Sequence, residues 1–176
     1  MTTLTPARAI TLRAAAPADE SLLRRIFEQS RSADFSGFPA GLRPALVDMQ
    51  YRAQQAQYSA QYPEARHEVI LVDGAVAGRI LVDESGTAWR LIDISVSSEH
   101  RNGGIGTAVL SEVCERASAS GRPVELSVWA GNRAARRLYE RLGFSVAAER
   151  PDYLSLHRAP DALPSTAGHN RIARTS

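Results

Sequence analysis

RNGGIGT, residues 101–107, joins a predicted strand to a predicted helix. The run before it, Leu91-Ile92-Asp93-Ile94-Ser95-Val96, is typical of a strand, and apolar residues recur at helical spacing from Ile105 to Ala117 after it. A helix N-terminus leaves its first amide N–H groups unpaired and carries partial positive charge, so it attracts anions. Gly103, Gly104 and Gly106 have no Cβ atom, so no side chain blocks the close approach of an anion to the main chain. Taken alone, the loop fits a phosphate site and a turn without a ligand equally well.

Two familiar nucleotide-binding motifs are absent from this loop. Its glycine spacing is neither Gly-x-Gly-x-x-Gly nor Gly-x-x-x-x-Gly-Lys, so it favours neither a dinucleotide site nor a P-loop. All 21 basic residues are arginine, which excludes Schiff-base chemistry by a lysine. Arg101 places one fixed positive charge beside the glycines.

Composition predicts one globular domain in a reducing compartment. The 176 residues are 44% hydrophobic, which is enough for a single core. Cys114 is the only cysteine, and the four histidines lack the spacing of metal ligands, so we expect no disulfide and no metal. The net charge of +2 argues against nucleic-acid binding despite four arginines between residues 133 and 141. We expect a cytoplasmic protein without a membrane span or signal peptide.

Periodicity and turn signals predict an α/β (α+β) fold in one domain over residues 1–158, followed by a disordered tail over 159–176. Expected strands cover residues 10–14, 69–72, 76–82, 88–96, 124–129, 144–148 and 153–157. Expected helices cover residues 17–31, 46–60, 105–117 and 133–142, and the loop 32–44 is rich in glycine and proline.

The sequence resembles the GNAT superfamily of N-acetyltransferases. That family's acetyl-CoA signature is Arg or Gln, two residues, Gly, one residue, then Gly or Ala, and residues 101–106 match it. A second block typical of the family, Asn132-Arg133-Ala134-Ala135-Arg136-Arg137-Leu138-Tyr139-Glu140-Arg141-Leu142-Gly143-Phe144, follows at the right distance. The resemblance covers roughly residues 10–157. Two blocks in the right order are far more specific than one.

The resemblance implies a mixed, mostly antiparallel sheet of six to seven strands, splayed between residues 88–96 and 124–129. Acetyl-CoA is expected in the opening as the cosubstrate. Its pantetheine arm is expected to pair with the main chain of Ile94, Ser95 and Val96. Its pyrophosphate is expected on the signature loop, and these residues are Arg101, Asn102, Gly103, Gly104, Ile105, Gly106 and Thr107. Asn132 matches the family asparagine that contacts the cofactor arm, and it is equally suited to cap the following helix.

The resemblance also implies direct acetyl transfer to an amine. Tyr139 matches the family tyrosine that acts as general acid on the departing thiolate, and it lies two helical turns after Asn132. The main-chain N–H of Val96 is the implied donor to the thioester carbonyl. The general base is open, because Ser127 stands near the position where some members carry glutamate. Asp93 and Glu68 are the side-chain candidates, and a chain of waters is the alternative.

The acceptor is expected to be a primary amine of a small molecule or peptide. Phe35, Phe38, Trp89 and Trp129 are candidate walls of its site, although each is also typical of a core. Self-association is frequent in the family, so a homodimer is a further expectation. The alternative function is a catalytically silent module that binds acyl-CoA.

Overall fold

The structure is a computed structural model that describes residues 8–161 and 173–174. Its strands are β1 (Ile10–Ala14), β2 (Arg66–Val72), β3 (Ala75–Asp83), β4 (Trp89–Val96), β5 (Val124–Trp129), β6 (Ser145–Glu149), β7 (Tyr153–Arg158) and β8 (Ala173–Arg174). Its α-helices are α1 (Glu20–Ser30), α2 (Ser32–Phe35), α3 (Arg43–Gln61), α4 (Ile105–Ala119) and α5 (Arg133–Arg141). Each strand and helix expected between residues 10 and 157 is confirmed. The one-turn helix α2 lies in the segment expected to be a loop.

All the strands form one sheet in the order β6-β7-β5-β4-β3-β2-β1-β8. Only β4 with β5 and β1 with β8 run parallel, so the expected mixed, mostly antiparallel sheet is confirmed. The expected tail, residues 159–176, lies mostly outside the described residues, and within it Ala173–Arg174 form the two-residue strand β8 beside β1.

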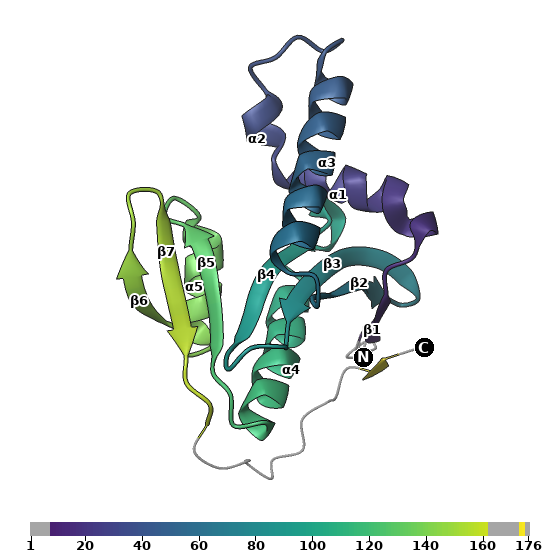
Figure 1. The fold of residues 1–176 in the computed structure, drawn as a ribbon. Coiled ribbons are helices and arrows are strands. Elements are labelled where there is room, and N and C mark those ends of the chain that lie inside the picture. Colours follow the sequence, from purple (N-terminus) through teal and green to yellow (C-terminus); the bar gives the residue numbers. More distant parts are fainter. Residues whose placement is uncertain (1–7, 162–172, 175–176) are drawn as a thin grey trace, which may run out of the picture.

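The sheet is splayed at its centre. Pairing of β4 with β5 covers only three residue pairs and ends at Leu91 with Leu126. Beyond that pair the two strands diverge toward Val96 and Trp129, as Figure 1 shows for the β4 and β5 ribbons. Beyond Leu91 the main chain of β4 is therefore paired to β3 on one edge and has no strand paired to its other edge among the described residues.

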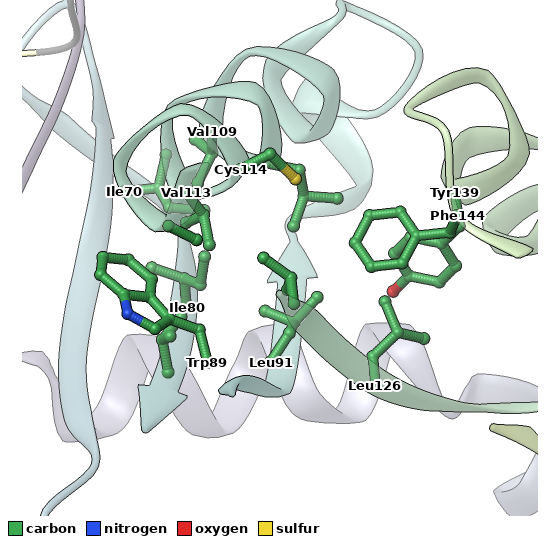
Figure 2. Close-up of a cluster of buried hydrophobic side chains, with 14 of the residues drawn as sticks. Ile70, Ile80, Trp89, Leu91, Val109, Val113, Cys114, Leu126, Tyr139 and Phe144 are labelled. Atoms are coloured by element: carbon green, nitrogen blue, oxygen red, sulfur yellow. The ribbon is translucent and has the colours of Figure 1, made fainter. Parts of the chain in front are cut away.

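Helices cover the two faces of the sheet with separate hydrophobic cores. On one face, the first core joins α4 and α5 to the strands, and Figure 2 shows Val109, Val113 and Cys114 of α4 above Ile80 and Leu91. On the opposite face, the second core joins α1 and α3 to β2, with Phe27, Val47 and Tyr51 fully or nearly buried. The sheet in which β4 and β5 diverge consequently has α4 and α5 on one face and α1 and α3 on the other.

No helix among the described residues is long and apolar enough to span a membrane.

Candidate active site

A bulge decides which way the β4 side chains point. Leu91 pairs with Val82 of β3, and Asp93 pairs with Leu81, so Ile92 is an extra residue in β4. In a regular strand Leu91 and Asp93 share a face. Because of the bulge, Leu91 packs in the first core while Asp93 faces α3 on the other side of the sheet.

The open edge of β4 presents main-chain groups to the splayed region. The N–H of Ser97 donates to the carbonyl of Ala77 in β3, at 2.8 Å. Since successive residues of a strand direct their main-chain groups to opposite edges, the N–H groups of Val96 and Ile94 point away from β3. The carbonyl of Val96 accepts a hydrogen bond from Nε of Arg101, at 3.1 Å. Of the three residues expected to pair with pantetheine, Ile94 and Val96 thus offer open-edge groups, while the main chain of Ser95 faces β3.

Gly78 allows β3 to approach β4 at this point. A Cβ at Gly78 would lie 2.4 Å from the carbonyl oxygen of Ser95 and 3.3 Å from Cα of Val96. No residue with a side chain fits there without moving the main chain of β4. The sequence analysis missed Gly78, and its position inside a strand was the available signal, because interior strand glycines mark close backbone approach.

The signature loop forms the N-terminus of α4. Gly104 has a φ of +77° and Asn102 a φ of +60°, so both lie in the left-handed region. The first helical hydrogen bond runs from the N–H of Ala108 to the carbonyl of Gly104. The amides of Ile105, Gly106 and Thr107 precede it, so they lack an intrahelical acceptor and are oriented for an anion.

Two further observations refine the roles of the loop glycines. A Cβ at Gly103 would lie 3.1 Å from Nη1 of Arg8, so a second guanidinium accompanies Arg101 at the loop. A Cβ at Gly106 would meet Cδ2 of Leu138 at 3.5 Å, an ordinary contact distance. Gly106 therefore lies in the first turn of α4 and also beside Leu138 of α5. Sequence reasoning missed Arg8, which precedes all predicted elements.

Asn132 caps α5. Its side-chain Oδ1 accepts a hydrogen bond from the N–H of Ala135, at 3.1 Å. The capping role expected for Asn132 is therefore present, and its contact with the cofactor stays a prediction.

Tyr139 lies on α5 at the edge of the opening. Its ring is 7% exposed and packs edge-to-face against Phe144, with ring centroids 5.7 Å apart. Figure 2 shows its hydroxyl oxygen directed toward Leu126, the residue at which the β4–β5 pairing ends. Burial first, and the negative charge of Asp93 second, raise the pKa of the Tyr139 phenol to about 12. The charge of Asp93 therefore acts on the Tyr139 phenol.

Asp93 carries a charged partner. Its carboxylate forms an ion pair with Arg79 of β3, with 2.7 Å between Oδ2 and Nη2. Burial raises the pKa of Tyr58 on α3 to about 12, with the charge of Asp93 as the next cause. The charge of Asp93 thus acts on a tyrosine of α3 and on a tyrosine of α5.

Glu68, the other candidate base, is placed differently. It lies on β2, which β3 separates from β4, and it is buried beside Arg66, with 3.3 Å between Oε1 and Nη2. The structure does not bring Glu68 to the opening.

The four candidate walls of the acceptor site fall into two groups. Phe35 and Trp89 are each 3% exposed and belong to the two cores. Trp89 lies where β4 and β5 are paired, with the guanidinium of Arg116 4.8 Å from its ring centroid. Phe38 and Trp129 are 45% and 57% exposed, and Trp129 lies at the divergent end of β5. Only these last two offer a surface to a ligand.

No cluster of three or more histidine, cysteine or acidic side chains within residues 8–161 and 173–174 is arranged to hold a metal ion. Cys114 is buried in the first core, and burial raises the pKa of its thiol to about 11, which suppresses the reactive thiolate.

Comparison with known proteins places this geometry in context. A family model described as the acetyltransferase (GNAT) family matches residues 26–144. A search of curated proteins finds no match. The structure resembles the PaiA N-acetyltransferase of Thermoplasma acidophilum in complex with coenzyme A, with a TM-score of 0.67 and 16% identity over 86% of this chain and 99% of that one.

Two other solved structures share the fold. The ribosomal-protein-S18-alanine N-acetyltransferase of Escherichia coli has a TM-score of 0.64 and 19% identity, over 91% of this chain and 99% of that one. A GNAT family acetyltransferase of Elizabethkingia anophelis with acetyl-CoA bound has a TM-score of 0.52 and 15% identity, over 58% and 82% of the two chains. At these identities the likeness establishes the fold alone.

Proposed function

Because the chain belongs to the acetyltransferase (GNAT) family, whose model matches residues 26–144, we propose that it transfers the acetyl group of acetyl-CoA to a primary amine. The acceptor is a small molecule or a peptide, and transfer is direct within a ternary complex. The observation that supports this proposal is the splay of β4 from β5 beyond Leu91 and Leu126, with the Tyr139 hydroxyl directed toward Leu126 and Asp93 two residues after Leu91 on β4.

Acetyl-CoA supplies an activated thioester carbonyl. The residues proposed to hold it are the amides of Ile105, Gly106 and Thr107 at the pyrophosphate, with the guanidinium of Arg101 beside them. The open-edge groups of Ile94 and Val96 extend the sheet toward the pantetheine arm, as an added strand does.

The reaction moves two protons. A neutral amine attacks the thioester carbonyl, and the N–H of Val96 donates to the developing oxyanion. The amine then loses a proton to Asp93, directly or through water, while the C–S bond breaks and the leaving thiolate takes the proton of Tyr139. Return of the proton from Asp93 to the tyrosinate, through water, restores the site.

The effect of the Asp93 charge on Tyr139 suits this order of proton transfers. Burial first, and the charged carboxylate second, raise the pKa of the phenol, so the phenol is protonated before reaction. Once Asp93 takes the proton of the amine, its charge disappears, so Tyr139 becomes a stronger acid at the moment that the thiolate leaves.

The two faces of the sheet separate cofactor and acceptor. Tyr139 belongs to the core under α4 and α5, whereas Asp93 faces α3. We therefore place acetyl-CoA on the α4 side and the acceptor on the α3 side, where Trp129 is exposed. Glu68 has no part in this scheme because β3 lies between its strand and β4.

The test is thiol release from acetyl-CoA with a panel of amines, amino acids, polyamines and peptides, with acetylated product identified by mass spectrometry. We expect acetylation of at least one amine class. Tyr139→Phe should lower kcat by about 10² or more, with acetyl-CoA affinity within about twofold because the ring still packs on Phe144. Binding of acetyl-CoA without product from any amine favours the silent module instead.

A further inference from the structure

Arg79 is a buried cation on the acceptor side of the sheet. It projects from β3, is 3% exposed and sits opposite Ser95 of β4 in the strand register. Burying a guanidinium costs free energy unless its charge is paired and its N–H groups have hydrogen-bond acceptors. The partners of Arg79 therefore show what its position accomplishes.

The guanidinium of Arg79 contacts one carboxylate oxygen of Asp93, Oδ2, and does not contact the other, Oδ1. Nε of Arg79 donates to Oδ2 of Asp93 at 2.8 Å, and Nη2 forms an ion pair with the same oxygen at 2.7 Å. The remaining contact of the carboxylate is with the hydroxyl of Ser95, which is 3.4 Å from both oxygens. Such long contacts are weak. Among the described residues, Oδ1 therefore has no short hydrogen bond, and the carboxylate is 19% exposed.

The same guanidinium is anchored to α3. Nη2 of Arg79 also donates to Oε1 of Gln54, at 2.8 Å, and the guanidinium lies 5.9 Å from the ring centroid of Tyr51. Both residues lie on the inward side of α3, where Tyr51 is buried in the second core. Arg79 thus ties the helix on the acceptor side to the carboxylate on the cofactor strand.

We propose that Arg79 is a positioning residue for acetyl transfer: it fixes Asp93 through Oδ2, so that Oδ1 is the oxygen that accepts the proton of the amine or of a bridging water. Gln54 and Tyr51 fix Arg79 in turn. The inference rests on the proposed function in one respect, that Asp93 takes part in the reaction.

Kinetics of variants test this role. Arg79→Met, which retains most of the side-chain volume, should lower kcat by about 10- to 100-fold, the usual cost of losing a group that orients a reacting residue. The KM for acetyl-CoA should stay within about twofold, because Arg79 lies on the acceptor side. Arg79→Lys retains the charge and should recover part of the loss, although it cannot form both contacts to Oδ2.

A double variant separates positioning from an independent contribution. Because Arg79 acts through Asp93, Arg79→Met combined with Asp93→Asn should be no slower than Asp93→Asn alone, within about twofold. Multiplicative losses in the double variant, or an Arg79→Met enzyme with the wild-type kcat, overturn the proposal.

The matched control is Arg90→Met. Arg90 also forms an ion pair at 2.7 Å, with Glu125 of β5, but both side chains are 39% exposed and lie where β4 and β5 are paired. It should leave kcat within about twofold. Circular dichroism and thermal unfolding of each variant establish that it is folded.

A readout without turnover distinguishes failure of this inference from failure of the proposed function. With ¹³Cγ-labelled aspartate, the Asp93 signal is assigned by its loss in Asp93→Asn. It should shift in Arg79→Met and not in Arg90→Met. If wild type acetylates no amine, the proposed function fails and this signal still decides whether Arg79 holds Asp93. An unmoved signal in Arg79→Met shows that it does not.

Discussion

Among the side chains proposed to take part in the reaction, Tyr139 has a pKa that is raised well above the ordinary value of a tyrosine. Its phenol is buried against Phe144, and its pKa of about 12 reflects burial first and the charge of Asp93 second. No hydrogen bond joins its hydroxyl to another described residue, so the proton is free to go to the leaving thiolate. A general acid has to be protonated before it can act, so a raised pKa extends the working range toward high pH.

We therefore predict that kcat shows no loss from ionisation of Tyr139 through pH 10, the ordinary pKa of a tyrosine. Asp93→Asn removes the carboxylate charge, which is the second cause of the raised Tyr139 pKa. The alkaline fall in kcat should therefore move to lower pH, while burial keeps it above the ordinary tyrosine pKa of 10. The measurement is kcat against pH, with Tyr139→Phe as the reference that lacks this limb. An alkaline limb near pH 9 in wild type contradicts the assignment.

At the scale of elements, α4 combines a buried stripe with an anion-oriented N-terminus. Gly104 at its start and Gly121 just after its end both have positive φ, +77° and +68°, and a Cβ at either meets nothing within 4 Å. The two glycines therefore differ in location and share the same backbone requirement.

This pair supports a controlled prediction. Gly104→Ala and Gly121→Ala should each lower the free energy of unfolding by about 1 kcal/mol, the cost of left-handed backbone in a residue with a Cβ. Only Gly104→Ala should also weaken acetyl-CoA binding, because it alters the loop proposed to hold the pyrophosphate. Chemical unfolding and calorimetric titration measure the two effects. Equal acetyl-CoA affinities in the two variants argue against a phosphate at this loop.

The β4 strand depends on its neighbour in a way that no local pattern describes. Gly78 lets β3 approach the main chain of Ser95 and Val96, while the bulge at Ile92 turns Asp93 away from the first core. The same eight-residue strand therefore presents main-chain groups at the opening and a carboxylate to α3.

At the scale of the whole molecule, the two parts of the sheet meet along only three residue pairs of β4 and β5. A cosubstrate that binds in the opening should therefore act as the missing continuation of the sheet. Because binding to the native state raises its stability, acetyl-CoA at about 100 times its Kd should add about 2.7 kcal/mol to the free energy of unfolding.

We predict that acetyl-CoA protects amides from hydrogen exchange only near the opening between β4 and β5. In hydrogen exchange, acetyl-CoA should slow the open-edge amides of Ile94 and Val96 and the amides at the start of α4, because these are proposed to become bonded. Amides of the fully paired strands β2 and β3, such as those of Val69 and Ile80, are already bonded within the sheet and should change little. A uniform change across the sheet, or none at the open edge, contradicts the proposed binding mode.

Patterns within short segments were sufficient to identify the strand–loop–helix order, the signature loop, the cap at Asn132 and the family. These features depend on the spacing of neighbouring residues and on backbone preferences, both of which are local. The splay was also expected, although only through the resemblance to the family. The alternation of strand and helix signals along the chain indicated a mixed sheet with helices, which the structure confirms.

Contacts between distant segments decided the remaining features of the site. A bulge reverses the side-chain alternation after Leu91, so the sequence left the direction of Asp93 open. Trp89 and Phe35 are apolar rings whose burial depends on where strands pair and helices pack. Arg79, Gln54 and Asp93 come from three separate elements, and only tertiary packing places a guanidinium between the other two.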